Sequence, residues 1–183
     1  GQLSGTLRGA TVGAQDFPDA DIRIVDTEIV AGGLGALGLE ADRWAKVGMD
    51  AETIIEKAKA MAKRHRVFFV VDTLEYLYKG GRIGAASHLI GSLLQMKPIL
   101  TMKDGVVASF ESQRTHKRAL ARLKEIIEAQ CPKGPQSFLN IMHGDAHDLA
   151  TDLAGELSAQ LNIPIDQIPI YDFGESRVRL AEE

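Results

Sequence analysis

Residues 73–83 read Thr-Leu-Glu-Tyr-Leu-Tyr-Lys-Gly-Gly-Arg-Ile, and residues 97–105 read Lys-Pro-Ile-Leu-Thr-Met-Lys-Asp-Gly. The first stretch predicts a short amphipathic helix that breaks at a double glycine, with Arg82 directly after the break. A second, mostly apolar helix is predicted to run from there to Gln95. The second stretch predicts a β-hairpin, because Asp-Gly between two apolar runs favours a tight turn.

The hairpin strands are expected at Ile99–Met102 and Val106–Phe110, and strands and helices alternate through the rest of the chain. A continuous apolar run is typical of a strand covered on both faces, and this is the interpretation for Val67–Val71. Alternating strands and helices predict an α/β layered fold, with a mixed sheet in its second half. The other strands are expected at Ile22–Asp26, Phe138–Met142 and Ile168–Tyr171; helices are expected at Ser4–Gln15, Ala31–Lys46, Thr115–Ala129 and Ala146–Leu161, with a further helix capped by Asp50.

The polar run at residues 63–66 separates two apolar elements and predicts a domain boundary near residue 65. Residues 1–65 then form the remnant of a first, parallel-sheet domain, and residues 66–183 form a second, mixed α/β domain. Two or three helices and one strand bury too little apolar surface to fold alone. The first part is therefore expected to lean on the second part or on another copy.

Composition favours a soluble globular protein of ordinary size, with 45% hydrophobic and 25% charged residues. The net charge of −4 argues against a broad nucleic-acid surface. No apolar run is long enough to span a membrane. The single cysteine, Cys131, excludes an internal disulfide and favours a reduced, cytoplasmic location. A solvated helix face is the simple interpretation of the basic residues at 114–124, and a small anionic site is the sharper one.

Several motifs carry a chemical and a simpler interpretation. Gly33–Gly38 matches the dinucleotide pattern Gly-x-Gly-x-x-Gly, but it does not sit in a tight turn between a strand and its helix. It is therefore predicted to lie inside a helix. The five histidines are too scattered to supply three or four converging metal ligands, so no metal site is expected. No catalytic triad, phosphate loop or paired carboxylates stand out.

Ser4, Gly5 and Thr6 stand at a predicted helix start, where a hydroxyl and free backbone N–H groups suit a carboxylate or phosphate. A plain N-cap at Ser4 is the alternative. Arg82 and Arg114 each follow an element boundary and allow two interpretations, a surface arginine or an anion contact. A guanidinium fork pairs bidentately with carboxylate or phosphate oxygens.

These segments in this order resemble the DegV family of bacterial lipid-binding proteins. The resemblance rests on Leu3–Thr6, the two stretches quoted above, and Arg114-Thr115. It implies a two-domain α/β fold that binds one long-chain fatty acid, with the carboxylate near Ser4 and the arginines at the mouth of the site. It also implies a carrier in phospholipid metabolism, without catalytic residues or cofactor, that presents the carboxylate to a separate fatty-acid kinase.

Family members carry more sequence before the Ser-Gly-Thr loop and end with Gly-x-His-x-Gly-Pro-Gly, so the chain is expected to be a fragment of such a two-domain protein or a divergent form of it. Here Asp172-Phe173-Gly174 is followed by Glu175 and Ser176. The tail of the fatty acid is expected in an apolar tunnel between domains, lined by Leu34, Leu37, Leu89, Ile90, Leu93, Leu94 and Met96. The alternative function is a phosphoryl- or acyl-transfer enzyme in which Arg82 and Arg114 clamp an anion. Such an enzyme is expected to need a general base, and the sequence shows none outside isolated histidines.

Overall fold

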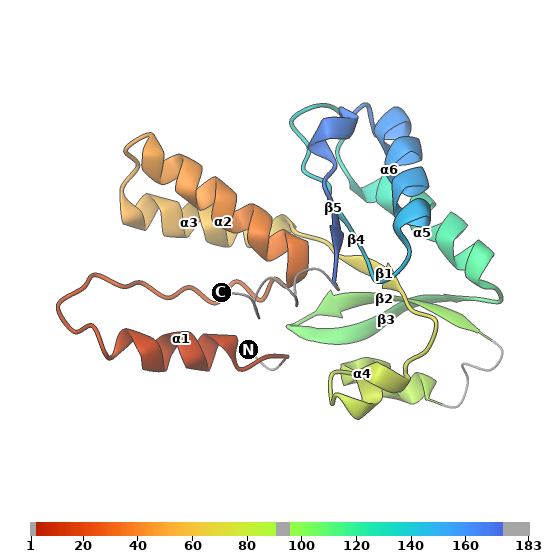
Figure 1. The fold of residues 1–183 in the computed structure, drawn as a ribbon, viewed down its shortest axis with the longest axis horizontal. Helices are drawn as coiled ribbons and strands as arrows, with labels where there is room; N and C mark the ends of the chain where they lie inside the picture. The colour runs from red at the N-terminus through yellow and green to blue at the C-terminus, as the bar shows by residue number, and fades with distance from the viewer. Residues whose placement is uncertain (1–2, 91–95, 174–183) are drawn as a thin grey trace. The chain divides into compact units, whose positions relative to one another are not determined.

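The computed structural model describes residues 3–90 and 96–173, which begin with three helices and continue with strands and helices in turn, apart from the consecutive strands β2 and β3 (Figure 1). Parallel and antiparallel strand pairs both occur, so the mixed α/β class is confirmed. The helices are α1 (Thr6–Ala14), α2 (Ala31–Lys46), α3 (Ala51–Arg64), α4 (Glu75–Lys79), α5 (His116–Gln130) and α6 (His147–Leu161), with 3-10 helices η1 (Gly84–Leu89) and η2 (Ile165–Gln167). The strands are β1 (Phe68–Val70), β2 (Lys97–Lys103), β3 (Val106–Gln113), β4 (Ile141–His143) and β5 (Ile170–Asp172).

The predicted hairpin is confirmed, and it is the centre of an antiparallel sheet in the order β1-β2-β3. Asp104 and Gly105 both take positive φ at its turn, as a two-residue hairpin loop requires. Phe68 on β1 packs edge-on against Phe110 on β3, with ring centroids 5.0 Å apart. The sequence predicts that Val67–Val71 forms a strand covered on both faces. This prediction is wrong, because β1 is an edge strand of the described sheet and is only half-buried.

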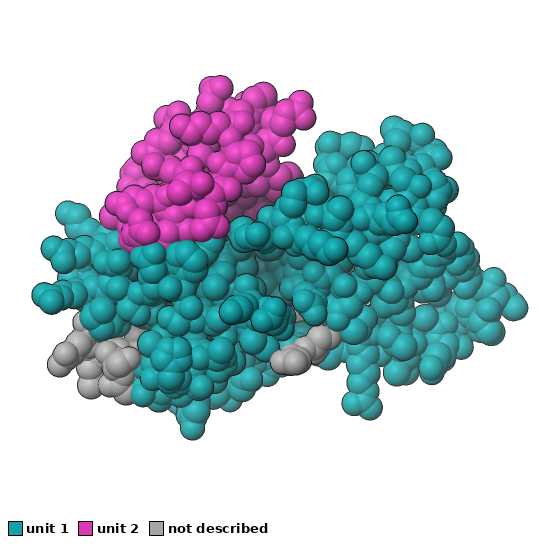
Figure 2. Space-filling model, turned by 180° about the vertical axis from the view of Figure 1, so that it is seen from behind, with its two compact units in different colours: residues 1–119 teal, residues 120–183 magenta. Residues whose placement is uncertain are grey.

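The chain divides into two compact units, residues 1–119 and 120–183 (Figure 2). The core of the first unit packs η1 and the start of α4 against the hairpin and is built from Leu74, Ile83, Ala86, Leu100 and Val107. The core of the second unit packs α6 against the parallel pair β4-β5. The described strands thus form two sheets, one antiparallel and one parallel. The predicted domain boundary near residue 65 stays a prediction.

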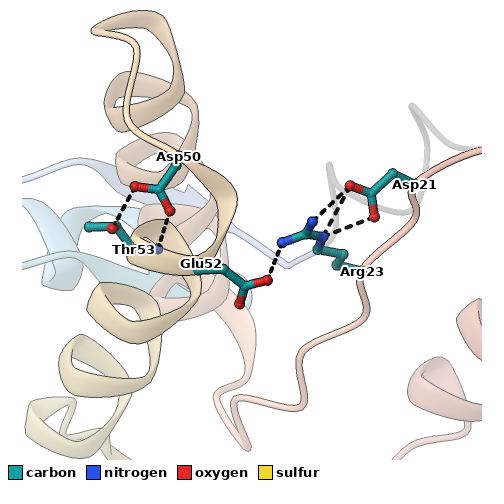
Figure 3. A network of polar contacts seen from close by, with 5 residues as sticks. All are labelled: Asp21, Arg23, Asp50, Glu52 and Thr53. Atoms are coloured by element: carbon teal, nitrogen blue, oxygen red, sulfur yellow. Dashed lines mark hydrogen bonds and ion pairs between the residues drawn. The ribbon is translucent and has the colours of Figure 1, made fainter.

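Helix α3 begins as its sequence predicts. The Asp50 side chain accepts hydrogen bonds from the backbone N–H and the hydroxyl of Thr53, at 3.0 and 2.7 Å (Figure 3). This arrangement satisfies one of the N–H groups that a helix start leaves unpaired. These contacts lower the pKa of the Asp50 carboxyl, the backbone hydrogen bond from Thr53 contributing most.

The predicted strand Ile22–Asp26 is wrong, because the structure gives this segment no regular secondary structure. A strand needs a neighbour that exchanges backbone hydrogen bonds, and no described strand pairs with it. A side chain of this segment connects it to α3 instead. Arg23 donates to Asp21 at 2.9 Å and to Glu52 at 2.6 Å, at the N-terminal end of α3 (Figure 3).

Gly33 to Gly38 lie within α2, so the prediction that this motif is helical and not a phosphate loop is confirmed. Gly33 is buried, and a Cβ atom at this position would overlap the His65 ring. His65 stands at the end of α3. Its half-buried position and the neighbouring Arg66 lower its pKa, so the ring is disfavoured as a cation. Gly33 therefore allows α2 to pack closely against His65 at the end of α3.

We expect Gly33→Ala to lower the free energy of unfolding by about 1–3 kcal/mol, because the His65 ring must be displaced. Gly35→Ala is the matched control, because a Cβ there meets open space in the same helix. It should raise stability by up to about 1 kcal/mol through better helix propensity. Urea unfolding of both variants checks the pair, and equal effects would contradict the packing of His65 on Gly33.

Candidate functional site

An open groove with a volume of about 730 Å³ brings together two segments that lie more than 60 residues apart in the sequence. One wall is the start of the chain and one face of α1, and the other is the segment just after α4. Ser4, Gly5 and Arg82 all line this groove, so three of the five predicted site residues share one hollow. The remaining lining residues are Leu3, Leu7, Arg8, Thr11, Val12, Gly80 and Gly81.

The α1 wall follows helical spacing. Leu7 and Thr11 lie four residues apart, as do Arg8 and Val12, which places them in adjacent rows on one helix face. Leu3, Leu7 and Val12 give this wall an apolar character, whereas Ser4, Arg8 and Thr11 supply polar groups. An apolar wall with a few polar groups is typical of a small-molecule site, and the volume falls within the usual range of about 300–1,000 Å³.

Ser4 and Thr6 form a small hydroxyl cluster at the start of α1. The Ser4 hydroxyl accepts the backbone N–H of Thr6 at 3.0 Å and shares a hydrogen bond with the Thr6 hydroxyl at 2.5 Å. The predicted N-cap at Ser4 is wrong by one position, because Gly5 is the cap residue and makes no side-chain hydrogen bond. Ser4 nevertheless satisfies the first amide of the helix, and Thr6 lies beside the groove without lining it.

The opposite wall of the groove is the tight turn that ends α4. The backbone N–H of Arg82 donates to the Leu77 carbonyl at 2.8 Å, and Gly81 takes a φ of +69° between them. A left-handed residue just past a helix is the usual way to end it, and glycine adopts this conformation at little cost. The Arg82 guanidinium donates to the Gly80 carbonyl, which holds it at the groove.

The helix predicted after Arg82 is shorter and tighter than expected. The structure has the 3-10 helix η1, which ends at Leu89, and the backbone becomes extended at Ile90. The predicted end at Gln95, and the predicted lining residues Leu93 and Leu94, lie outside the described residues. None of the other predicted tunnel residues lines the groove: Leu37 is buried within its unit, and Leu34 and Ile90 are exposed.

Arg114 does not line the groove. It is exposed at the end of the hairpin, just before α5. The neighbouring Thr115 hydroxyl accepts the backbone N–H of Arg118 at 3.2 Å, which is a helix-capping contact. The groove therefore contains one of the two predicted arginines. It also contains Arg8, which was not predicted as a site residue although it lies four residues after Ser4.

Cys131, His143 and His147 are not among the residues that line the groove. Burial raises the pKa of the Cys131 thiol, which disfavours the reactive thiolate. His143 and His147 pack edge to face with ring centroids 5.4 Å apart, one from β4 and one from α6. Residues 3–90 and 96–173 contain no group of three or more His, Cys, Asp or Glu placed to hold a metal ion. Within the same ranges, no helix has the length and apolar character to cross a bilayer.

The family model described as "Uncharacterised protein, DegV family" matches residues 1–175. The chain belongs to the DegV family. A DegV domain-containing protein of Streptomyces coelicolor is 38% identical over 156 residues, which cover 85% of this chain and 55% of that protein. The family expected from the sequence motifs is thus confirmed.

Solved DegV structures agree. A fatty acid binding DegV family protein from Streptococcus agalactiae superposes with a TM-score of 0.81 at 32% identity, covering 93% of this chain and 60% of that one. A fatty-acid-binding DegV family protein from Thermus thermophilus gives a TM-score of 0.78 at 31% identity, with the same coverage of both chains. The chain therefore has the DegV fold and spans little more than half the length of the relatives it matches.

Proposed function

We propose that the protein binds one long-chain fatty acid, with its carboxylate in the groove that Ser4 and Arg82 both line. The observation that carries the proposal is the groove itself, which gathers Ser4, Gly5 and Arg82 beside an apolar helix face. Two family members of similar structure are described as fatty acid binding. The positive end of the α1 dipole and a guanidinium both favour an anion there.

Burial of the acyl tail supplies the affinity in this proposal. A 16-carbon tail has about 14 methylenes, and at about 0.8 kcal/mol each their burial is worth about 11 kcal/mol before the costs of association. Leu3, Leu7 and Val12 offer apolar contact next to the head group. The tunnel for the rest of the tail, with Leu34, Leu37 and Leu89 among its walls, stays a prediction.

We further propose that the protein acts as a carrier and not as an enzyme. The groove is open, so a head group bound there stays accessible to a second protein. Among the residues that the structure describes, its lining contains no histidine, cysteine or carboxylate that could serve as a general base. Such a carrier would present the fatty-acid carboxylate to a separate fatty-acid kinase in cytoplasmic phospholipid metabolism. Arg114, exposed at the start of α5, is proposed to contact the head group or the kinase.

Lipid titration tests the proposal directly. Native mass spectrometry of the purified protein should detect one retained fatty acid, and calorimetry with delipidated protein should give a single site for palmitate. Hexadecanol, with the same tail and no charge, should bind at least about tenfold more weakly, because charge-assisted hydrogen bonds are lost. Equal binding of the alcohol and the acid would contradict an anion site at Ser4 and Arg82.

The kinase role needs its own measurement. A purified fatty-acid kinase with ATP should phosphorylate palmitate faster when the lipid is supplied on this protein than when it is supplied in detergent. The protein alone, with ATP and palmitate, should form no product. A product made without the kinase would favour the transfer-enzyme alternative.

A further inference from the structure

His143 is a buried histidine in the second compact unit, at the end of β4 (Figure 1). Its register partner on the parallel strand β5 is Asp172. Only 8% of His143 is exposed, and among residues 3–90 and 96–173 it is the one polar or charged residue that is buried. It does not line the groove of the proposed lipid site, so its burial calls for a separate explanation.

The Nδ1 atom of His143 supports the start of α6. The backbone N–H of Ala146, the N-cap residue of α6, donates to this nitrogen at 3.4 Å. Because the donor is an amide, Nδ1 carries no proton in this arrangement, and the neutral ring has its proton on Nε2. The ring thus accepts the N-cap amide, which is the role that a glutamate or glutamine has in a capping box.

A carboxylate faces the same nitrogen. An oxygen of Asp172 lies 3.9 Å from Nδ1, and the side chain of Asp172 is 32% exposed. The ring of His147, in the first turn of α6, packs edge to face against the His143 ring. Asp145 and Asp148 lie in the turn before α6 and in its first turn, and both are exposed. The ring therefore has two competing partners at one nitrogen, an amide donor and a carboxylate acceptor.

We propose that His143 is a pH-sensitive switch, which holds the start of α6 while its ring is neutral and releases it when the ring is protonated. A protonated imidazole has two N–H donors and no acceptor, so Nδ1 can no longer accept the Ala146 amide. The new N–H group donates to Asp172 instead. Protonation thus exchanges a contact with the start of α6 for a contact with the end of β5.

Histidine suits this role because its ordinary pKa, about 6.5, lies close to physiological pH. The switch acts outside the groove and goes beyond the proposed lipid binding, so neither depends on the other. Loss of the Ala146 contact should loosen the first turn of α6, since an amide at a helix start then has to find water as its acceptor. The core of this unit packs α6 against β4 and β5 and should stay folded.

A pH titration followed by NMR provides the test. We expect the hydrogen-exchange protection factor of the Ala146 amide to fall about two- to tenfold when the His143 ring is protonated, because one neutral hydrogen bond is lost. The ring nitrogens of His143 report its protonation in the same samples, and both signals should change with one midpoint. Arg118 is the matched control, since its amide donates at the start of α5 to the Thr115 hydroxyl, which does not titrate in this range.

Two variants separate the switch from a merely structural role. The Oδ1 atom of His143→Asn can accept the Ala146 amide at every pH, so this variant should keep the amide protected from pH 8 to pH 5. Asp172→Asn removes the carboxylate that favours the protonated ring, so its transition should move to lower pH. If His143→Asn does not fold, the native protein and Asp172→Asn decide the question by the same two signals.

Three results would overturn the switch. The first is a His143 ring that titrates while the protection of Ala146 stays constant, or a ring that does not titrate between pH 8 and pH 5. The second is an equal loss of Ala146 protection in the native protein and in His143→Asn. The third is a neutral ring with its proton on Nδ1 at pH 8, because that tautomer cannot accept the amide. An unchanged midpoint in Asp172→Asn would contradict the exchange of partners.

Discussion

Gly84→Ala is expected to lower the free energy of unfolding by about 2–5 kcal/mol, a large share of the roughly 5–15 kcal/mol that stabilises a typical domain. Gly84 takes a φ of +54°, which costs an L-residue about 1–2 kcal/mol. A Cβ at this position would also lie 2.5 Å from the Val107 carbonyl oxygen and 3.0 Å from its backbone nitrogen. Val107 is buried in β3 and cannot move without disturbing the hairpin.

Gly81→Ala is the matched control for this prediction. Gly81 has a similar φ of +69°, but a Cβ there meets no atom within 4 Å. Gly81→Ala should lower the free energy of unfolding only by what a positive φ costs an L-residue, about 1–2 kcal/mol. Urea unfolding of both variants, with an unchanged dependence on denaturant, measures the difference. If the two variants lose equal stability, then η1 does not pack against β3 as closely as the structure shows.

Local signals predicted most of the regular elements. The Ala/Leu-rich run at α2 matches its predicted bounds, and the Asp50 cap forms as its spacing to Thr53 suggests. The hairpin follows from Asp104-Gly105, where two positive φ angles suit the turn. In each case the interactions that determine the element join residues only a few positions apart, so the local sequence is enough to predict it.

Predictions failed where the deciding partner is remote. The apolar pattern Ile22–Asp26 is strand-like, but no described strand supplies its hydrogen bonds. The apolar stretch after Arg82 suggests an α-helix, whereas close packing of Gly84 on β3 accompanies a tighter 3-10 turn. The cap of α1 is an exception, since its contact is local: the Ser4 hydroxyl accepts the backbone N–H of Thr6, the first helical residue, and Gly5 is the cap residue.

At the candidate site, too, local sequence predicts some features and only the fold reveals the others. Ser4 and Arg82 could be named from motifs, but only the fold reveals that they line one groove. Arg8 and Thr11 carry no motif signal of their own, although their spacing along α1 follows from helical geometry. The sequence predicts that Arg114 and Arg82 act as a pair, but in the structure Arg114 does not line the groove. Spacing along a helix could have predicted Arg8; the meeting of two distant segments could not have been predicted.

Ser4→Ala is expected to weaken palmitate affinity by about 10- to 150-fold, since a hydrogen bond to a charged group is worth about 1.5–3 kcal/mol. Exposure of Ser4 places the expected value toward the lower end of that range. The substitution also removes the acceptor for the Thr6 backbone N–H. We therefore expect an accompanying loss of about 1 kcal/mol or less in stability, which is the usual cost of losing a capping contact.

Thr73→Ala separates the two effects. The Thr73 hydroxyl accepts the backbone N–H of Glu75 at 3.1 Å at the start of α4, which is the same local contact that Ser4 makes with Thr6 at 3.0 Å. Thr73 does not line the groove. Both variants should lose similar stability in thermal unfolding, and only Ser4→Ala should lose palmitate affinity in calorimetry. If both variants keep the native affinity, Ser4 does no more than start its helix, and the carboxylate must bind at another part of the protein.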